Sequence, residues 1–258
     1  MPSVTLINFS ESPFELISGS SPLFTKLLTD FAGDKAASDL QAVAPYLAII
    51  KNNGTTSVRS FTVICNTVSP NGQAKPMTVT FEVKPGVSPG EMVLTAPASG
   101  LMLYMSAEPG NQGAGHAGPA LRNISHLNER MANFLRDFTE ETELSLSLDS
   151  VIFRDHTFVG PDHAGKFEEE NRERQITREI VTELLNRAPS ERSAYLNTII
   201  DNPQSNDSLA VPEFDQRQWI ASRFQGAADR GDEGLFRRSM ENILNDEVRP
   251  LRRRTKGS

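Results

Sequence analysis

Residues 58–83 of the chain read VRSFTVICNTVSPNGQAKPMTVTFEV. In the first half Phe61, Val63 and Cys65 occupy every second position, and in the second half Met77, Val79, Phe81 and Val83 do the same. This alternation fits a β-strand, whose side chains point to opposite faces in turn, whereas an amphipathic helix needs a period near 3.6. Asn71-Gly72 between the halves is a strong hairpin signal, because both residues tolerate positive φ. The stretch therefore predicts two antiparallel strands joined by a turn.

Short apolar and β-branched runs on both sides of this hairpin extend the pattern. They lie at residues 4–9, 46–50, 92–95, 101–104, 144–153 and 157–159. About eight short strands with turn-forming residues between them are typical of an antiparallel β-sandwich, and we expect an immunoglobulin-like one. Strands do not alternate with helices in this region, which argues against a parallel doubly wound sheet.

Helical patterns divide the chain into two parts. Within the predicted sandwich, a short helix or two is expected at 21–43, and a helical insertion that begins with a glycine-rich loop is expected near 107–142. After residue 163 the apolar residues recur at helical spacing, and four helices are predicted. The expected architecture is α+β, with a β-sandwich domain over residues 1–163 and an all-α region over residues 164–258.

Composition sets limits on the class of protein. Of 258 residues, 38% are hydrophobic and 23% are charged, as in soluble globular proteins. No apolar run approaches the roughly 20 residues of a membrane helix, and the first residues lack the features of a signal peptide. The single cysteine excludes an internal disulfide and a cysteine-based zinc site. We expect a cytoplasmic protein without a membrane span.

Two Asp-His pairs, Asp155-His156 and Asp162-His163, stand at either end of a predicted short hairpin. Carboxylates and imidazoles are common metal ligands, and a hairpin could bring the two pairs together. These residues predict a metal site and, with it, a metal-dependent enzyme. Asp and His are also ordinary turn residues, and the spacing matches no established metal motif. The sequence leaves both interpretations open.

A basic cluster closes the chain, with no acidic residue after Glu247. It consists of Arg249, Arg252, Arg253, Arg254 and Lys256. Clustered basic side chains release counterions when they bind phosphates, so the tail predicts contact with nucleic acid or another polyanion. Against this, the formal net charge of the whole chain is −7, and no aromatic residues are interleaved for stacking on bases.

Other catalytic and cofactor motifs are absent or out of context. Gly113–Gly118 matches G-x-G-x-x-G, but Pro119 follows at once and no strand-to-helix turn surrounds it. The chain has neither a Gly-x-Ser-x-Gly elbow nor a His-Glu-x-x-His helix. Cys65 falls on the predicted buried face, where thiols are inert. We therefore expect no cofactor and favour a non-enzymatic binding or assembly module, whose partner is another protein or a second copy of the chain.

Overall fold

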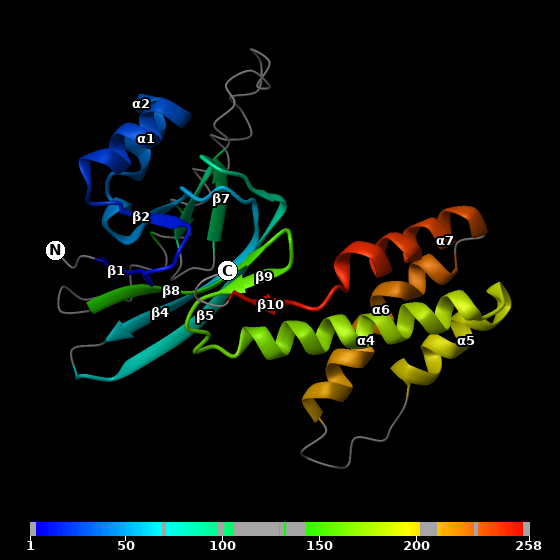
Figure 1. Cartoon of the computed structure of the whole chain (residues 1–258). Coiled ribbons are helices and arrows are strands. Elements are labelled where there is room, and N and C mark those ends of the chain that lie inside the picture. Colours follow the sequence, from blue (N-terminus) through cyan, green and yellow to red (C-terminus); the bar gives the residue numbers. More distant parts are fainter. Residues whose placement is uncertain are drawn as a thin grey trace. The chain divides into compact units, whose positions relative to one another are not determined.

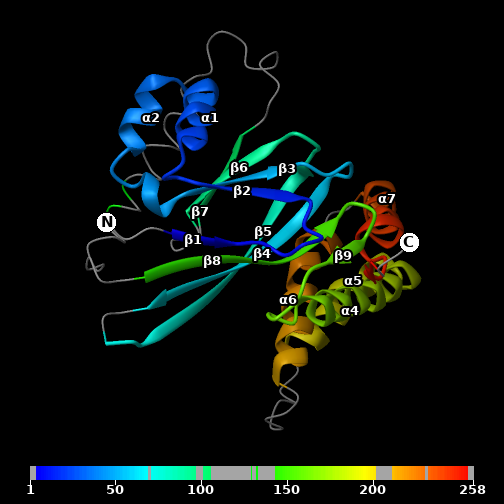
Figure 2. The same ribbon diagram turned by 60° about the vertical axis from the view of Figure 1, so that its left-hand side comes forward.

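The computed structural model describes residues 4–68, 71–96, 101–105, 129, 132, 143–201, 211–229 and 232–254, with the backbone alone at 36, 84–85, 101–105, 211–215 and 247. These residues form a mixed α+β protein with two β-sheets (Figures 1 and 2). The chain divides into two compact units: unit 1 comprises Met1–Ala164 with Arg253–Ser258, and unit 2 comprises Gly165–Arg252. Apart from residues 129 and 132, which are helical, the predicted insertion near 107–142 lies outside the described residues.

The predicted hairpin lies within the larger sheet, sheet A. Its strands are, in order, β10 (Arg252–Arg253), β9 (Thr157–Val159), β8 (Glu143–Phe153), β4 (Val58–Val68) and β5 (Ala74–Val87), and β1 (Val4–Ile7) also pairs with β8. The antiparallel pairing of β4 with β5 confirms the hairpin. The pairing of β1 with β8 is parallel. Sheet A is therefore mixed, and the prediction of a purely antiparallel sheet was wrong. Alternation shows which face of a strand is buried, and it does not show the direction of the neighbouring strand.

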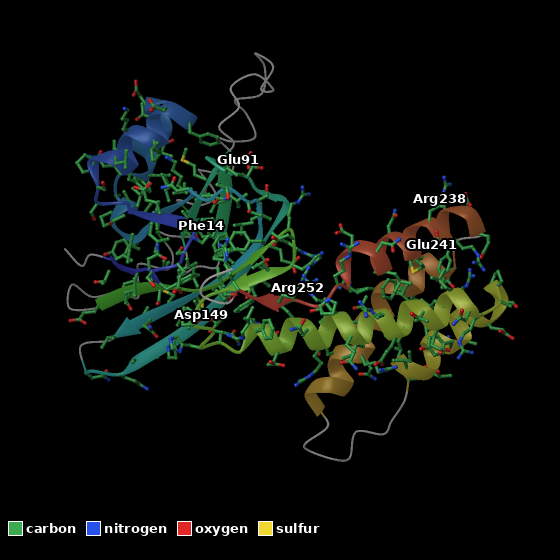
Figure 3. The ribbon with its side chains drawn as sticks, in the orientation of Figure 1. Phe14, Glu91, Asp149, Arg238, Glu241 and Arg252 are labelled. Carbon is green, nitrogen blue, oxygen red and sulfur yellow. The ribbon has the colours of Figure 1, made fainter. Side chains whose placement is uncertain are left out.

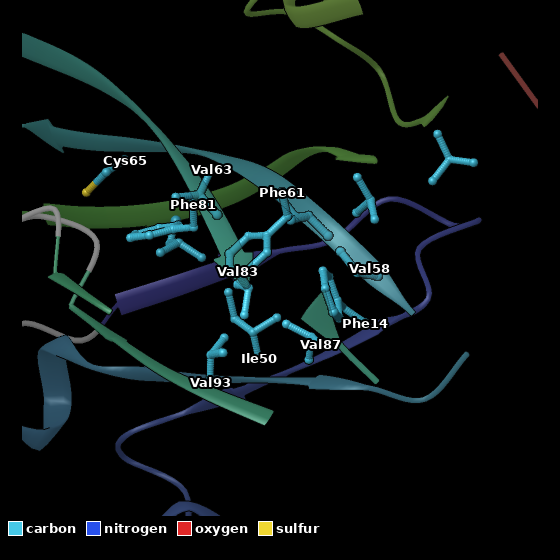
Figure 4. Close-up of a cluster of buried hydrophobic side chains, with 14 of the residues drawn as sticks. Phe14, Ile50, Val58, Phe61, Val63, Cys65, Phe81, Val83, Val87 and Val93 are labelled. Carbon is cyan, nitrogen blue, oxygen red and sulfur yellow. The ribbon is translucent and has the colours of Figure 1, made fainter. Parts of the chain in front are cut away.

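Sheet B contains, in order, β2 (Phe14–Ser18), β3 (Ala48–Asn52), β6 (Met92–Ala96) and β7 (Leu101–Met105), all antiparallel. The two sheets share a hydrophobic core. In it, the ring centroid of Phe61 in β4 lies 5.2 Å from those of Phe14 in β2 and Phe81 in β5 (Figure 4). Aromatic pairs at this separation add to the stability gained by burial. Phe61 and Phe81, whose alternation predicted β4 and β5, thus lie in the core shared with sheet B, where Phe61 packs against Phe14 of a strand that was not predicted.

Helices cover the other face of sheet B. The helices α1 (Pro22–Ala32) and α2 (Asp34–Leu40) lie side by side there, followed by the short turn η1 (Ala44–Tyr46) (Figures 1 and 2). Phe24 and Leu28 of α1 pack with Ile49 and Leu94 of sheet B in a second core. Ser21 begins α1 by accepting a hydrogen bond from the N–H of Leu23, as an N-cap does. Unit 1 therefore has three layers, and the helices predicted at 21–43 form the first.

Unit 2 is helical. It contains α4 (Lys166–Asn186), α5 (Pro189–Ile200), α6 (Val211–Ala228), α7 (Glu233–Asn242) and the short π-helix η3 (Ile243–Glu247). One core joins the helices, with Ile180 and Leu184 of α4, Leu196 of α5 and Ile220 of α6 all fully buried. The helical periodicity after residue 163 is thereby confirmed. In the described part of the chain, none of the helices is both long enough and apolar enough to cross a membrane.

The end of the chain differs from the helical pattern predicted for it. After η3, Arg174 and Arg178 of α4 donate hydrogen bonds to the backbone carbonyls of Arg249 and Val248, both at 2.9 Å. The described residues then continue as β10 in sheet A rather than as a helix. Periodicity could not show this, because a strand of two residues has no repeat to detect.

Candidate functional site

Asp155 and His156 form the turn between β8 and β9. Asp155 Oδ1 accepts a hydrogen bond from the N–H of Thr157 at 2.9 Å, which closes the turn locally. His156 has a φ of 67°, its N–H donates to the carbonyl of Phe153, and the residue is 4% exposed. Positive φ is uncommon for residues other than glycine and is concentrated in turns. In the structure, both residues shape the hairpin.

The second Asp-His pair lies around a buried carboxylate that sequence reasoning missed. Asp149 in β8 is 1% exposed (Figure 3). Its Oδ1 accepts the N–H of His163 at 2.8 Å, and its Oδ2 accepts the N–H of Ala164 at 3.2 Å. The N–H of Asp162 donates to the backbone carbonyl of Asp149 at 3.3 Å. Three successive N–H groups therefore converge on Asp149, which holds the segment before α4 against β8.

The alternation of buried residues in β8 changes at Asp149, and this change could have revealed the residue. Before it, the even-numbered Leu146 and Leu148 are buried in the core, and after it the odd-numbered Val151 and Phe153 are. Such a shift of one residue marks a β-bulge, which re-aims a side chain. The register between β8 and β4 shifts at this place. The sequence pattern thus indicated the bulge at Asp149, but it did not indicate that the N–H groups of His163 and Ala164 would bind this carboxylate.

Asp162 takes part in an ion pair within unit 1. Its Oδ2 accepts a hydrogen bond from Arg253 Nη2 at 2.7 Å, and its side chain is 5% exposed. The Arg253 guanidinium also lies 5.3 Å from the centre of the Phe158 ring. The pair is charge-assisted and only partly shielded, because the Asp162 carboxylate is buried while the Arg253 side chain is 50% exposed. Asp162 and Arg253 therefore fasten β10 beside β9.

The four predicted metal ligands do not gather into one site. Asp155 closes its own turn, and the N–H of His163 is bound to Asp149. Within the ranges that the structure describes, no group of three or more His, Cys, Asp or Glu residues is arranged to hold a metal ion. The metal site and the metal-dependent enzyme built on it stay predictions.

The predicted polyanion residues have different surroundings. Arg253 is paired with Asp162, and the N–H of Arg254 donates to the carbonyl of Phe158 at 3.0 Å. Lys256 lies outside the described residues. The four described arginines, Arg249, Arg252, Arg253 and Arg254, are all exposed, and Arg253 is the one paired with Asp162. Deleting residues 249–258 would remove β10, so neutralising the exposed arginines is the cleaner test of polyanion binding, which also stays a prediction.

Cys65 is buried in the core between the sheets, with 2% exposure. Burial raises the pKa of its thiol to about 11. At neutral pH the thiolate, which is the nucleophilic form, is therefore scarce, and the sulfur is shielded from substrate. Cys65 acts as a small apolar core residue.

An exposed tryptophan on α6 is the surface feature that stands out in unit 2. Trp219 is the only tryptophan of the chain and is 54% exposed. The helix buries Ile220, Ala221 and Phe224 in the core of unit 2. Trp219 lies on the other side, with Ser222, Arg223 and Gly226, which are also exposed. Residues three, four and seven apart share one helix face, so these four form a continuous stripe, which we call the Trp219 face.

Arg223 and Glu173 shape the chemistry of the Trp219 face. The Arg223 guanidinium lies 4.7 Å from the centre of the Trp219 ring, a cation–π distance. Arg223 Nη1 also donates to Glu173 Oε1 of α4 at 3.5 Å, and the two side chains are 49% and 30% exposed. The arginine thus restricts the indole while it remains open to solvent. Sequence periodicity predicted the helix but did not distinguish Trp219, because Trp is apolar and next to the buried Ile220.

No known protein-family model matches the chain, no curated protein is significantly similar to it in sequence, and no solved structure is significantly similar to it in fold.

Proposed function

We propose that this chain is a non-enzymatic binding or assembly module that docks a protein partner through the Trp219 face. The observation that carries the proposal is the half-exposed Trp219, stacked under Arg223. Tryptophan and arginine are the residues most enriched at the energetic centres of protein interfaces. The immunoglobulin-like character of unit 1 is a separate proposal, which rests on the alternating strands and the core shared by the two sheets.

The energy available at this face is sufficient for an anchor. A tryptophan buries up to about 250 Å², so the exposed half offers about 100 Å². At about 25 cal/mol per Å², its burial by a partner contributes about 2.5 kcal/mol. The contact with Arg223 fixes the ring before binding, which lowers the entropy lost on docking. A single residue of this kind makes a binding contribution that substitution can measure.

Site-specific photo-crosslinking in the native host tests the proposal. A benzophenone amino acid replaces Ser222, which is exposed and small, and the matched control carries it at Thr182, exposed on α4. We expect a protein adduct from position 222 that is absent from position 182 and that disappears when Trp219→Ala is added. Equal adducts at both positions, or an adduct indifferent to Trp219→Ala, would refute docking through this face.

A further inference from the structure

Asn-Gly sequences occur twice in the chain, as Asn53-Gly54 and as Asn71-Gly72. In this dipeptide the backbone nitrogen of the glycine can attack the side-chain carbonyl of the asparagine, because glycine has no Cβ atom to obstruct the approach. The reaction requires that the attacking nitrogen can lose its proton, that the side-chain nitrogen can leave, and that water reaches both. The two sites differ in these respects, and the sequence alone does not distinguish them.

Asn71-Gly72, in the turn between β4 and β5, meets the requirements. Both residues are exposed, and a Cβ atom added at Gly72 would meet nothing within 4 Å. Among the residues that the structure describes, the Gly72 N–H has no hydrogen-bond acceptor. Asn71 Oδ1 accepts a hydrogen bond from the N–H of Gln73 at 3.1 Å. This Asx turn folds the side chain back along its own backbone, so the carbonyl group is held near the Gly72 nitrogen.

At Asn53-Gly54 the corresponding atoms are engaged in hydrogen bonds. The Gly54 N–H donates to Oδ1 of the buried Asn52 at 2.9 Å. Asn53 Nδ2, which is the leaving nitrogen, donates to Glu15 Oε2 at 2.9 Å. A Cβ atom at Gly54 would lie 2.9 Å from Cβ of Pro13, so this glycine is also crowded. Attack here has to break two hydrogen bonds, and the one to the carboxylate is charge-assisted.

From this contrast we propose that Asn71 is a site of spontaneous deamidation through a succinimide and that Asn53 is protected from this modification. The Gly72 nitrogen forms a bond to Cγ of Asn71 and loses its proton to hydroxide or water. The bond between Cγ and Nδ2 breaks, and Nδ2 takes up a proton and leaves as ammonia. Water then opens the ring at either carbonyl, which gives aspartate or isoaspartate at position 71. Water is the only co-reactant.

Either product changes the turn between β4 and β5, and each adds one negative charge there. Aspartate keeps an oxygen that can accept the Gln73 N–H, so the turn is retained. Isoaspartate places an additional methylene group in the main chain between Val68 and Ala74, which are paired across the two strands. Because turn length sets the register of a hairpin, isoaspartate should loosen this end of sheet A. The site lies in unit 1 and is independent of docking through the Trp219 face.

Peptide mapping of the purified full-length chain after incubation at mildly alkaline pH tests the proposal. Trypsin cleaves after Arg59, so the two Asn-Gly sites fall in different peptides, and mass spectrometry measures the conversion of each amide to a carboxyl group. We expect Asn71 to react at least about tenfold faster than Asn53, which corresponds to a barrier about 1.4 kcal/mol lower.

Two controls separate the effect of the fold from that of the dipeptide. In urea the hydrogen bonds of Asn53 and Gly54 are lost, and both sites should react at similar rates. Asn71→Gln has a longer side chain that cannot close the same ring, so its conversion should fall to background. Equal rates at the two sites in the folded chain, or a faster reaction at Asn53, would overturn the proposal. An Asn71 that stays unmodified in the folded chain while both sites react in urea would also overturn it.

Discussion

Replacing Arg192 by alanine should destabilise unit 2 severely. The side chain belongs to α5 and is 2% exposed. Its Nε donates to the carbonyl of Leu184 at 3.0 Å, and its guanidinium lies 4.0 Å from the centre of the Phe236 ring. Its two terminal nitrogens donate to the two oxygens of Glu233 at 2.6 and 2.9 Å. One buried arginine thus joins α4, α5 and α7.

The loss of unfolding free energy in Arg192→Ala can be estimated from the three groups that lose their contact with the arginine: the Leu184 carbonyl, the Phe236 ring and the Glu233 carboxylate. Leu184 lies in the last turn of α4, where carbonyls lack a helical partner, and loss of a charged donor to it costs about 1.5–3 kcal/mol. The desolvated contact with Phe236 adds about 2 kcal/mol. Glu233 adds little, because it is partly exposed and keeps Arg237 as a partner at 2.9 Å. We expect the free energy of unfolding of unit 2 to fall by about 3–5 kcal/mol, which is a large part of the usual stability of a domain.

Urea denaturation followed by helical circular dichroism measures this loss. Arg192→Lys keeps the charge but loses the planar fork and should recover only part of the stability. Arg238→Ala is the matched control, because Arg238 is exposed and, among the described residues, donates a hydrogen bond to Gly234 of its own helix. This variant should change stability by less than about 0.5 kcal/mol. A loss below about 1 kcal/mol for Arg192→Ala would refute the assigned role of the buried network.

Three further predictions concern pH, thiol chemistry and backbone geometry. The hydrogen bonds from Arg192 hold the pKa of Glu233 at about 2, below its ordinary 4.5. The stability from this pair should therefore be complete above pH 4.5 and be lost as pH falls toward 2, with a weaker acid dependence in Arg192→Ala; equal acid profiles of unfolding would contradict this. Cys65, with its pKa of about 11, should react with a disulfide reagent at pH 8 only as fast as the protein unfolds, and rapid labelling of folded protein would show that the core is open. Gly160→Ala should cost more than about 2 kcal/mol, because φ is 128° and the added Cβ would lie 2.2 Å from the carbonyl oxygen of Asp149. Thermal unfolding checks this, and an unchanged melting temperature would argue against the contact.

The helices and strands could be predicted from the sequence wherever buried apolar residues recur at a regular spacing along the chain. Alternation placed β4 and β5 as a hairpin, and helical spacing placed α4 through α7. Strands β2 and β10 were missed, because the buried residues of β2, Phe14 and Ile17, are three positions apart and do not alternate, and β10 has only two residues. The parallel partnership of β1 with β8 was also missed, because residues that alternate in the same way can pair in either direction.

The candidate sites were harder to predict because each depends on neighbours from distant segments. The two Asp-His pairs were recognised from their residue types alone. In the structure, the N–H of His163 binds Asp149 in β8, and Asp162 binds Arg253 in β10, and these partners come close only when the chain folds. Trp219 lies within one of the four predicted helices, but the sequence did not single it out. Only the burial of Ile220 and Phe224 showed that the indole faces away from the core.

The sequence by itself indicated the secondary structure of most of this protein: mainly strands before residue 163, with helices at 21–43, and mainly helices after it, with apolar residues at the matching periods. Each period arises because one helix or strand turns one face toward a core, so the period can be recognised within a single segment of the sequence. The tertiary structure decided which charged groups meet, which residues near the end of the described chain become a strand, and which aromatic side chain stays exposed to solvent. These outcomes depend on contacts between residues far apart in the sequence, such as Asp162 and Arg253, which are 91 positions apart, and no local period encodes such contacts.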